Sequence, residues 1–233
     1  MTLEQKLSSK RKRVVILGGG FAGLEFAKKF EAEDVDLVLV DRENHHLFQP
    51  LLYQVATAGL SAPDVAQPIR SILSGKQNLT VVMDEVRRID LDGKQVELSG
   101  ETLGYDHLVI ALGSRTNYFG NDQWARYAPG LKSLEDARRI RNSILSAYER
   151  AEVSTDPEEI KRLLTVVVIG GGPTGVELAG AFSELARHTL RRDFRHIDSS
   201  KTRVILLEGL PRLLPAFSEW SSEKALKHLH ELG

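Results

Sequence analysis

Cysteine is absent from the chain of 233 residues. Without thiols the sequence can form no disulfide and no cysteine-ligated metal site, and it can pass no electrons through a protein dithiol. The adjacent His45 and His46 are the kind of pair that a metal site would need. Neighbouring side chains point in different directions in most backbones, so we predict no metal site.

Long apolar runs are lacking as well. No stretch of the sequence reaches the roughly 20 apolar residues that a transmembrane helix needs. The first residues carry no apolar core of a signal peptide. From these two absences we expect an intracellular, cytoplasmic location.

A strong charge of either sign is also missing. Lys and Arg number 31, Asp and Glu number 32, and the net charge is -1 with a pI near 6.7. This balance gives no electrostatic footprint for nucleic acid, so we expect no nucleic-acid partner. The composition, 42% hydrophobic and 27% charged, is that of an ordinary globular protein. The length allows one large domain or two small ones.

The first part of the chain predicts a βαβ unit. A β-branched run over residues 13–17 ends in glycines and predicts a strand. A helical pattern follows over 21–30, and a second apolar run over 35–40 ends at Asp41. Residues 45–57 have no clean period and predict a loop with irregular helix.

The middle of the chain predicts mixed elements. We expect a helix from Pro63 to Leu73, although Pro68 inside it favours a break. Residues 79–98 predict two strands joined at the turn pair Asp92-Gly93. Residues 107–112 predict a further buried strand that ends at a glycine.

The second half of the chain repeats the βαβ pattern. Ser133 is placed to cap a long helix with two acidic residues in its first turn. We expect that helix over residues 134–151 and a polar linker over 154–159. A strand over 165–169, a helix over 174–190 and a strand over 202–207 would follow, and then a final helix over 218–232.

A glycine motif joins the first predicted strand to its helix. Gly18, Gly20 and Gly23 fit the pattern G-x-G-x-x-G. The first glycine permits a tight turn, the second lets the backbone approach a pyrophosphate, and the third lets the helix pack close to the sheet. The helix N-terminus, with Phe21 and Ala22, offers free N–H groups to phosphates. We therefore predict a dinucleotide site here.

The second motif repeats the first in register. Gly170, Gly172 and Gly175 follow the strand over residues 165–169, with Pro173 and Thr174 between the last two glycines. The intact spacing predicts a second dinucleotide site. A glycine turn kept only for packing is the alternative for either motif.

An acidic residue lies at the end of the second predicted strand of each βαβ unit. Asp41 is placed to accept hydrogen bonds from a ribose diol, and Glu208 is the corresponding residue of the second unit. A carboxylate suits a 2′-hydroxyl and repels a 2′-phosphate, so both favour NAD-type ligands over NADP. Arg42 and Arg212 lie nearby and weaken this argument. Glycine spacing alone does not say which site holds which dinucleotide.

At these residues the sequence resembles a known family. The most specific stretch runs from His46 to Thr57 and reads HLFQPLLYQVAT. Residues 108–113 followed by TNYFG at 116–120, and GGGPTGVELAG at 170–180, match as well. The chain resembles the type II NADH dehydrogenases, which are NADH:quinone reductases of the two-dinucleotide flavoprotein superfamily. The resemblance covers essentially the whole chain.

The resemblance implies an α/β fold with two Rossmann-like dinucleotide domains, the second incomplete in this chain. Residues 1–125 would form the FAD-binding domain and residues 126–233 the NADH-binding domain. The implied reaction is hydride transfer from NADH to FAD, followed by electron transfer to a membrane quinone without proton pumping, as a step of the respiratory chain.

The resemblance also assigns residues. It places Gln49 and Pro50 beside the isoalloxazine, and Val86 at the adenine through its backbone. Ala111-Leu112-Gly113 matches a second FAD fingerprint, in which relatives commonly have threonine where this chain has Leu112. Glu177 matches a glutamate near the junction of nicotinamide and flavin. A solvated or ion-paired helix glutamate is the alternative for that residue.

Complete members of the family continue beyond residue 233 with a further FAD contact, quinone-site residues and amphipathic helices. We therefore expect the chain to be the N-terminal part of a longer protein and to be inactive alone. The full-length protein would lie as a peripheral protein on the inner face of the cell membrane, and a homodimer is compatible with the family. The identity of the quinone lies outside the chain.

Two other functions remain open from the sequence. One is a different FAD-dependent NAD(P)H reductase, such as a ferredoxin or rubredoxin reductase or an NADH oxidase. The other is an inactive dinucleotide-binding fragment. The stretch over residues 46–57 favours the quinone enzyme, and the missing cysteines disfavour dithiol reductases and sulfide:quinone reductases that depend on cysteine.

Overall fold

The computed structural model describes residues 11–233, which divide into two compact units. The first comprises residues 11–47 and 66–115, and the second comprises residues 48–65 and 116–233. Residues 1–10 of the predicted first domain lie outside the described residues. Both units contain a parallel sheet and helices, so the predicted α/β class is confirmed. The division into an FAD domain and an NADH domain stays a prediction.

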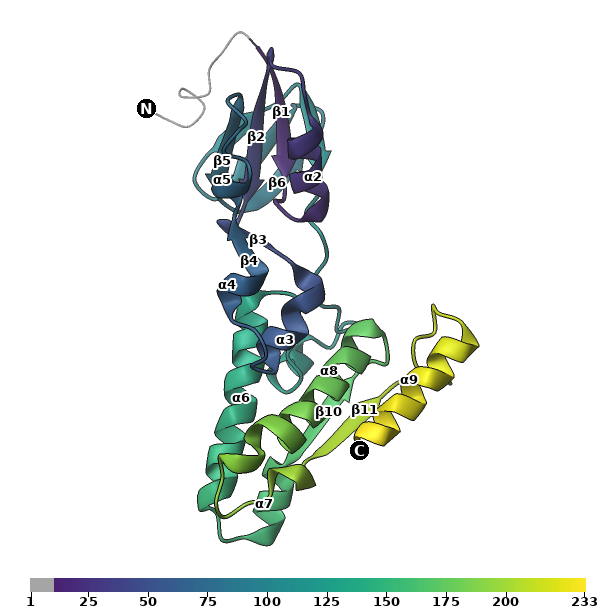
Figure 1. Cartoon of the computed structure of the whole chain (residues 1–233). Coiled ribbons are helices and arrows are strands. Elements are labelled where there is room, and N and C mark those ends of the chain that lie inside the picture. The colour runs from purple at the N-terminus through teal and green to yellow at the C-terminus, as the bar shows by residue number, and fades with distance from the viewer. Residues whose placement is uncertain (1–10) are drawn as a thin grey trace. The chain divides into compact units, whose positions relative to one another are not determined.

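A four-stranded parallel sheet is the centre of the first unit, in the order β5-β2-β1-β9 (Figure 1). Its strands are β1 (Lys12–Leu17), β2 (Val35–Asp41), β5 (Leu79–Met83) and β9 (His107–Ile110). The two central strands are runs of branched apolar residues, as expected for strands that are buried on both faces. Leu17 pairs with Val40, so β1 and β2 end at the same edge of the sheet.

Helices cover one face of this sheet. Helix α2 (Phe21–Lys29) follows the glycine motif and buries Leu24 and Ala27, which are three residues apart, against β1 and β2. The short helix α5 (Ile69–Ile72) adds the fully buried Ile69 to the same core. The helix predicted for residues 21–30 is thereby confirmed.

A three-stranded antiparallel sheet covers the other face. Strands β6 (Val86–Asp90), β7 (Gln95–Leu98) and β8 (Thr102–Gly104) pack apolar side chains against β1 and β2. The predicted turn at Asp92-Gly93 is confirmed, and the Gly93 N–H donates to the Asp90 carboxylate at 2.9 Å. The prediction of only two strands over 79–98 is wrong, because β5 is a separate strand that joins the parallel sheet beside β2.

The helix predicted from Pro63 to Leu73 is not continuous, and the break expected at Pro68 is confirmed. The segment divides into α4 (Ala62–Val65), β4 (Ala66–Pro68) and α5, and β4 pairs antiparallel with β3 (His45–Leu47). Pro68 has no N–H for a helical hydrogen bond, and its backbone is extended at ψ 125°. The region predicted as irregular over 45–57 contains β3, the 3₁₀ helix η1 (Gln49–Leu51) and α3 (Leu52–Ala56).

The second unit is built on the parallel pair β10 (Thr165–Ile169) and β11 (Arg203–Leu207), which confirms the second βαβ unit. Helix α8 (Pro173–Glu184) connects them and continues into a π turn over Leu185–Thr189 and a 3₁₀ turn over Leu190–Arg192. Two long helices, α6 (Leu134–Val153) and α9 (Glu219–Leu232), and the short α7 (Pro157–Leu163) complete the unit. Shorter 3₁₀ turns lie at Asp122–Arg126 and Ser199–Lys201.

Helix caps in this unit follow the sequence closely. Ser133 forms a capping box with Asp136, and Ser218 caps α9 through the Ser221 N–H. The predicted linker over 154–159 is wrong in its second half. Asp156 caps α7 there and Pro157 takes the first helical position, where a missing N–H has no cost.

Glu152 ties the segment after α8 to helix α6. Its carboxylate accepts hydrogen bonds from the backbone N–H groups of Arg195, His196 and Ile197 and from the His196 ring, at 2.8 to 3.2 Å. Desolvation alone would raise the pKa of Glu152, but these donors outweigh it and lower the pKa to about 2. The polar segment is therefore held to α6 through one carboxylate.

Candidate functional site

The first glycine turn lies where β1 ends and α2 begins. Gly18 has φ +100°, which side chains rarely adopt, and its N–H donates to the Val40 carbonyl at 2.7 Å. A Cβ on Gly18 would collide with the Ala111 carbonyl, and one on Gly23 would collide with the Gly18 carbonyl. The fold itself therefore requires glycine at these two positions.

Gly20 is different. Its backbone is extended at φ -70° and ψ -166°, a conformation that other residues adopt. A Cβ at this position would meet no protein atom within 4 Å. Neither strain nor packing requires glycine here, and its place at the N-cap of α2 is compatible both with glycine's preference for that position and with the predicted approach of a pyrophosphate. The open space lies at the N-terminus of α2, where free N–H groups and the helix dipole favour phosphate.

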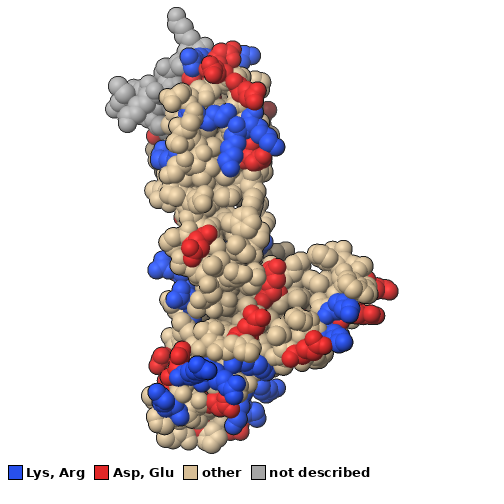
Figure 2. All heavy atoms as spheres, in the orientation of Figure 1, with Lys and Arg blue, Asp and Glu red and all other residues tan. Residues whose placement is uncertain are grey.

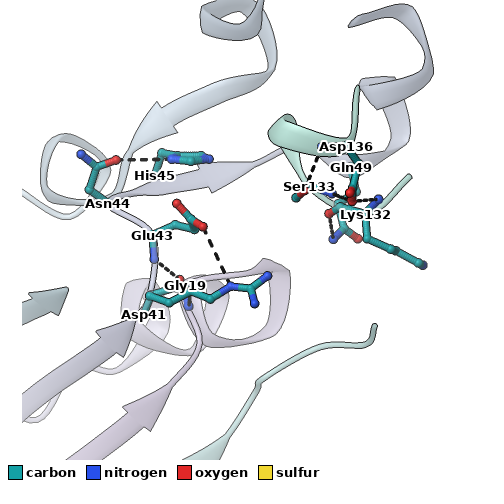
Figure 3. Close-up of polar contacts among 10 residues, drawn as sticks. Gly19, Asp41, Glu43, Asn44, His45, Gln49, Lys132, Ser133 and Asp136 are labelled. Carbon is teal, nitrogen blue, oxygen red and sulfur yellow. Dashed lines mark hydrogen bonds and ion pairs between the residues drawn. The ribbon is translucent and has the colours of Figure 1, made fainter. Parts of the chain in front are cut away.

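Asp41, at the end of β2, closes this turn. Its Oδ2 accepts the Gly19 N–H at 2.5 Å and its Oδ1 accepts the Glu43 N–H at 2.8 Å (Figure 3). A carboxylate oxygen accepts more than one hydrogen bond, so both oxygens keep capacity for ribose hydroxyls. Arg42 lies 3.9 Å from the Glu43 carboxylate, with more than half of its side chain exposed. The predicted roles of Asp41 and Arg42 in cofactor binding stay predictions.

The second glycine turn has the same construction. Gly170 has φ +107°, and its N–H donates to the Leu207 carbonyl at 2.8 Å. A Cβ on Gly175 would collide with the Gly170 carbonyl. Gly172 lies at φ -74° and ψ -178°, and a Cβ there would again meet no protein atom within 4 Å. In both turns, therefore, nothing in the packing requires glycine at the N-cap, Gly20 or Gly172.

Glu208 takes the place of Asp41 in this second turn. Its Oε2 accepts the Gly171 N–H at 2.7 Å and its Oε1 accepts the Leu210 N–H at 2.8 Å. The N–H donors, first Leu210 and then Gly171, hold the pKa of Glu208 below its ordinary value. The side chain is therefore an anion at neutral pH, as binding of a ribose diol requires. Pro173 opens α8 and the adjoining Thr174 is exposed.

Both turns are also supported from behind, by residues that the sequence patterns did not reveal. The middle glycine of the first turn packs on Ile69, and its carbonyl accepts a hydrogen bond from the His46 ring at 3.0 Å. In the second turn the middle glycine packs on Leu213, and its carbonyl accepts the Leu214 N–H at 2.7 Å. The triple glycines signal two crowded turns, but no local pattern signals which residue lies behind each.

Only some of the other predicted cofactor-binding residues of the first unit lie at its glycine turn. Ala111 continues the pairing of β9, its N–H donating to the Leu17 carbonyl at 2.8 Å, and its own carbonyl faces Gly18. Leu112 is 54% exposed and Gly113 has φ +72°. Val86 lies in β6 and packs against the core between the two sheets. The structure thus brings Ala111 to the glycine turn, and the cofactor roles of this group stay predictions.

Gln49 and Pro50 belong to the second compact unit, in helix η1. The Gln49 side-chain amide donates to the Lys132 carbonyl at 3.4 Å, close to the cap of α6 formed by Ser133 and Asp136 (Figure 3). Their expected place beside an isoalloxazine stays a prediction.

Glu177 lies on α8, five residues after Gly172 and thus within two turns of the helix N-terminus. Its side chain is exposed, and desolvation raises the pKa of its carboxyl above the ordinary value. A raised pKa is a feature of groups at reaction centres, and it also occurs in structural positions. Its expected role at a nicotinamide stays a prediction.

The rest of the described surface offers little else. Within residues 11–233 no group of three or more His, Cys, Asp or Glu could hold a metal, and no helix is long and apolar enough to cross a membrane. In the face that Figure 2 shows, acidic side chains lie among the basic ones in both units. A hollow of about 360 Å³ lies between α6, α7 and β10, but its Arg150 and Arg162 already pair with Glu159.

Comparisons with known proteins agree with two dinucleotide turns. A family model described as pyridine nucleotide-disulphide oxidoreductase matches residues 12–233. A type II NADH:quinone oxidoreductase of Mycobacterium tuberculosis is 51% identical over 96% of the chain, which corresponds to 49% of that protein. A mitochondrial external alternative NADH-ubiquinone oxidoreductase of Yarrowia lipolytica is 33% identical over 90% of the chain and 38% of its own length.

Solved structures add the fold. NDH2 of Plasmodium falciparum in complex with NADH has a TM-score of 0.88 at 28% identity, covering 96% of this chain and 47% of that one. A sulfide:quinone oxidoreductase of Aquifex aeolicus has a TM-score of 0.71 at 19% identity and shares the fold alone. The chain spans about half the length of the curated relatives from Mycobacterium tuberculosis that it matches.

Proposed function

The chain belongs to the pyridine nucleotide-disulphide oxidoreductase family, and on that premise we propose that it supplies the two dinucleotide sites of an NADH:quinone oxidoreductase. The observation that carries the proposal is the repeated turn. In each copy the fold requires the first and last glycines of the motif, whereas Gly20 and Gly172 face open space and nothing in the packing requires glycine there. Two such turns fit two dinucleotides: the names of the relatives give NADH, and the resemblance of the sequence to type II NADH dehydrogenases implies FAD.

We assign FAD to the turn at Gly18 and NADH to the turn at Gly170. In the first site the helix N-terminus faces the pyrophosphate with residues Gly20, Phe21, Ala22 and Gly23. Asp41 accepts hydrogen bonds from the hydroxyls of the adenosine ribose. The carbonyl of Ala111 facing Gly18 supports a place for Ala111, Leu112 and Gly113 beside the same cofactor. Val86 would contact the adenine, and Gln49 with Pro50 would contact the flavin ring.

In the second site Gly172, Pro173, Thr174 and Gly175 take the same roles toward NADH. The Glu208 carboxylate accepts hydrogen bonds from the ribose hydroxyls. It is an anion because backbone donors keep its pKa low. An anion at this place favours the 2′-hydroxyl of NADH over the 2′-phosphate of NADPH. Glu177, on the same helix, would lie near the reacting nicotinamide.

The bound flavin would supply the redox chemistry, by accepting a hydride from NADH and passing electrons to a quinone. The chain has no cysteine, so no disulfide of this chain takes part, although the family description names disulphide reductases. The quinone assignment rests on the relatives, among them the two from Mycobacterium tuberculosis, which are named for quinone reduction. From the resemblance to type II NADH dehydrogenases we further propose that the full-length protein is peripheral at the inner face of the membrane and pumps no protons; a homodimer is compatible with this.

The proposal is tested on the full-length protein. The purified protein should carry about one flavin per chain, NADH should bleach the flavin absorption without oxygen, and a soluble quinone should restore it. NADPH should bleach it far more slowly. A protein that binds no flavin, or a reduced flavin that a quinone does not reoxidise, would contradict the assignment.

A further inference from the structure

The two glycine turns hold their central peptide group by different means. In both, the N–H of the middle glycine donates to the strand-end carboxylate, Asp41 for Gly19 and Glu208 for Gly171. The carbonyl of Gly171 accepts a backbone N–H, that of Leu214, at 2.7 Å. The carbonyl of Gly19 instead accepts a side-chain donor, the His46 Nδ1, at 3.0 Å.

We propose that His46 is a positioning residue of the first dinucleotide site, which fixes the direction of the N–H that Gly20 presents to the pyrophosphate. In a trans peptide the carbonyl of one residue and the N–H of the next point in opposite directions. The Gly19 carbonyl points toward His46, so the Gly20 N–H points away from it, at the start of α2. The hydrogen bond to Asp41 comes from the Gly19 N–H, which belongs to the preceding peptide group, so the bond from His46 is what orients the peptide between Gly19 and Gly20.

The placement of His46 depends on a strand pairing. His46 lies in β3 opposite Gln67 of β4, and its ring packs edge-on against Phe21 with centroids 5.1 Å apart. A carbonyl oxygen can accept a hydrogen bond but cannot donate one, so the His46 Nδ1 must carry the proton that it donates to Gly19. The neighbouring His45 does not share this role, since its Nδ1 bonds the Asn44 side chain at 3.3 Å (Figure 3).

This inference rests on the proposed FAD site, and it is tested by binding of FAD itself to the full-length protein freed of flavin. His46→Phe keeps an aromatic ring beside Phe21 and removes the donor. His46→Asn keeps a donor at the place of Nδ1 and removes the ring. His45→Phe is the matched control on the same strand.

Loss of one neutral hydrogen bond should raise the dissociation constant of FAD about two- to tenfold in His46→Phe. His46→Asn should stay within about twofold of wild type, and His45→Phe should match wild type. The KM for NADH at saturating FAD should not change in any variant, because the second turn has its own donor in Leu214.

The outcomes separate the inference from the proposed function. If the wild-type protein binds no FAD, the proposed function fails and the inference fails with it. If wild type binds FAD and His46→Phe binds it equally well, only the inference is overturned. It is overturned as well if His46→Asn binds FAD as weakly as His46→Phe, because ring packing rather than the donor would then be responsible.

Discussion

Gly172 separates a binding turn from a packing turn more sharply than any other residue of the second unit. An alanine Cβ at this position would meet no protein atom within 4 Å, and φ -74° suits alanine. Gly172→Ala should therefore leave the fold intact, with a net change in stability of about 1 kcal/mol or less, because the lower entropy of the unfolded chain offsets the poorer helix N-cap that alanine makes at this position. The new methyl group lies in the space proposed for the pyrophosphate of NADH.

The magnitude follows from the contacts that a displaced phosphate would lose. One charge-assisted hydrogen bond is worth about 1.5–3 kcal/mol, so the KM for NADH should rise about 10- to 150-fold. Flavin content should not change. Gly175→Ala is the contrasting variant, because its Cβ would collide with the Gly170 carbonyl and force α8 away from β10. That overpacking should cost about 1–3 kcal/mol of stability.

The assay needs two measurements on the full-length protein and both variants. Thermal unfolding reports stability, and steady-state kinetics at saturating quinone report the KM for NADH. A Gly172→Ala protein that unfolds as early as Gly175→Ala, or one whose KM for NADH equals that of wild type, would refute the claim that the open space receives the dinucleotide.

Three more expectations concern carboxylates. Glu208→Gln should raise the KM for NADH about tenfold and reduce the preference for NADH over NADPH, with flavin content unchanged. An unaltered preference for NADH would contradict the assignment. Glu177→Gln should slow flavin reduction by NADH in stopped-flow experiments while FAD stays bound, and unaltered reduction and reoxidation would make Glu177 a structural residue. Glu152 has a pKa lowered from 4.5 to about 2, so its contribution to stability is full above pH 4.5 and is lost as pH falls toward 2. Glu152→Gln should destabilise the protein near neutral pH, and its deficit should shrink over that acid range; a deficit that does not depend on pH would contradict the mechanism.

Local signals in the sequence predicted much of this molecule. The glycine motifs, the branched apolar runs and the cap at Ser133 each depend on residues within one turn or strand, and each element lies where the pattern placed it. The sequence also singled out Asp41 and Glu208 as ribose ligands, but their hydrogen bonds to the glycine turns were not predicted.

The errors come from contacts between segments distant in sequence. Residues 66–68 form a strand only because His45–Leu47 lie beside them, and a helical pattern from Pro63 onward cannot reveal that partner. The placement of Leu79–Met83 depends in the same way on pairing with β2. The hydrogen bond from His46 to Gly19 spans 27 residues of chain and follows from the same pairing, so the motif alone did not reveal it.

The difference between the donors behind the two turns bears on how each site tolerates mutation. Every amino acid except proline carries a backbone N–H, so almost any substitution of Leu214 keeps the donor to Gly171. The donor to Gly19 belongs to one imidazole, and most substitutions of His46 remove it. The two sites thus differ in their tolerance of point mutations. A single substitution of His46 can remove the donor to the turn at Gly18, whereas the turn at Gly170 keeps its backbone donor under almost any substitution.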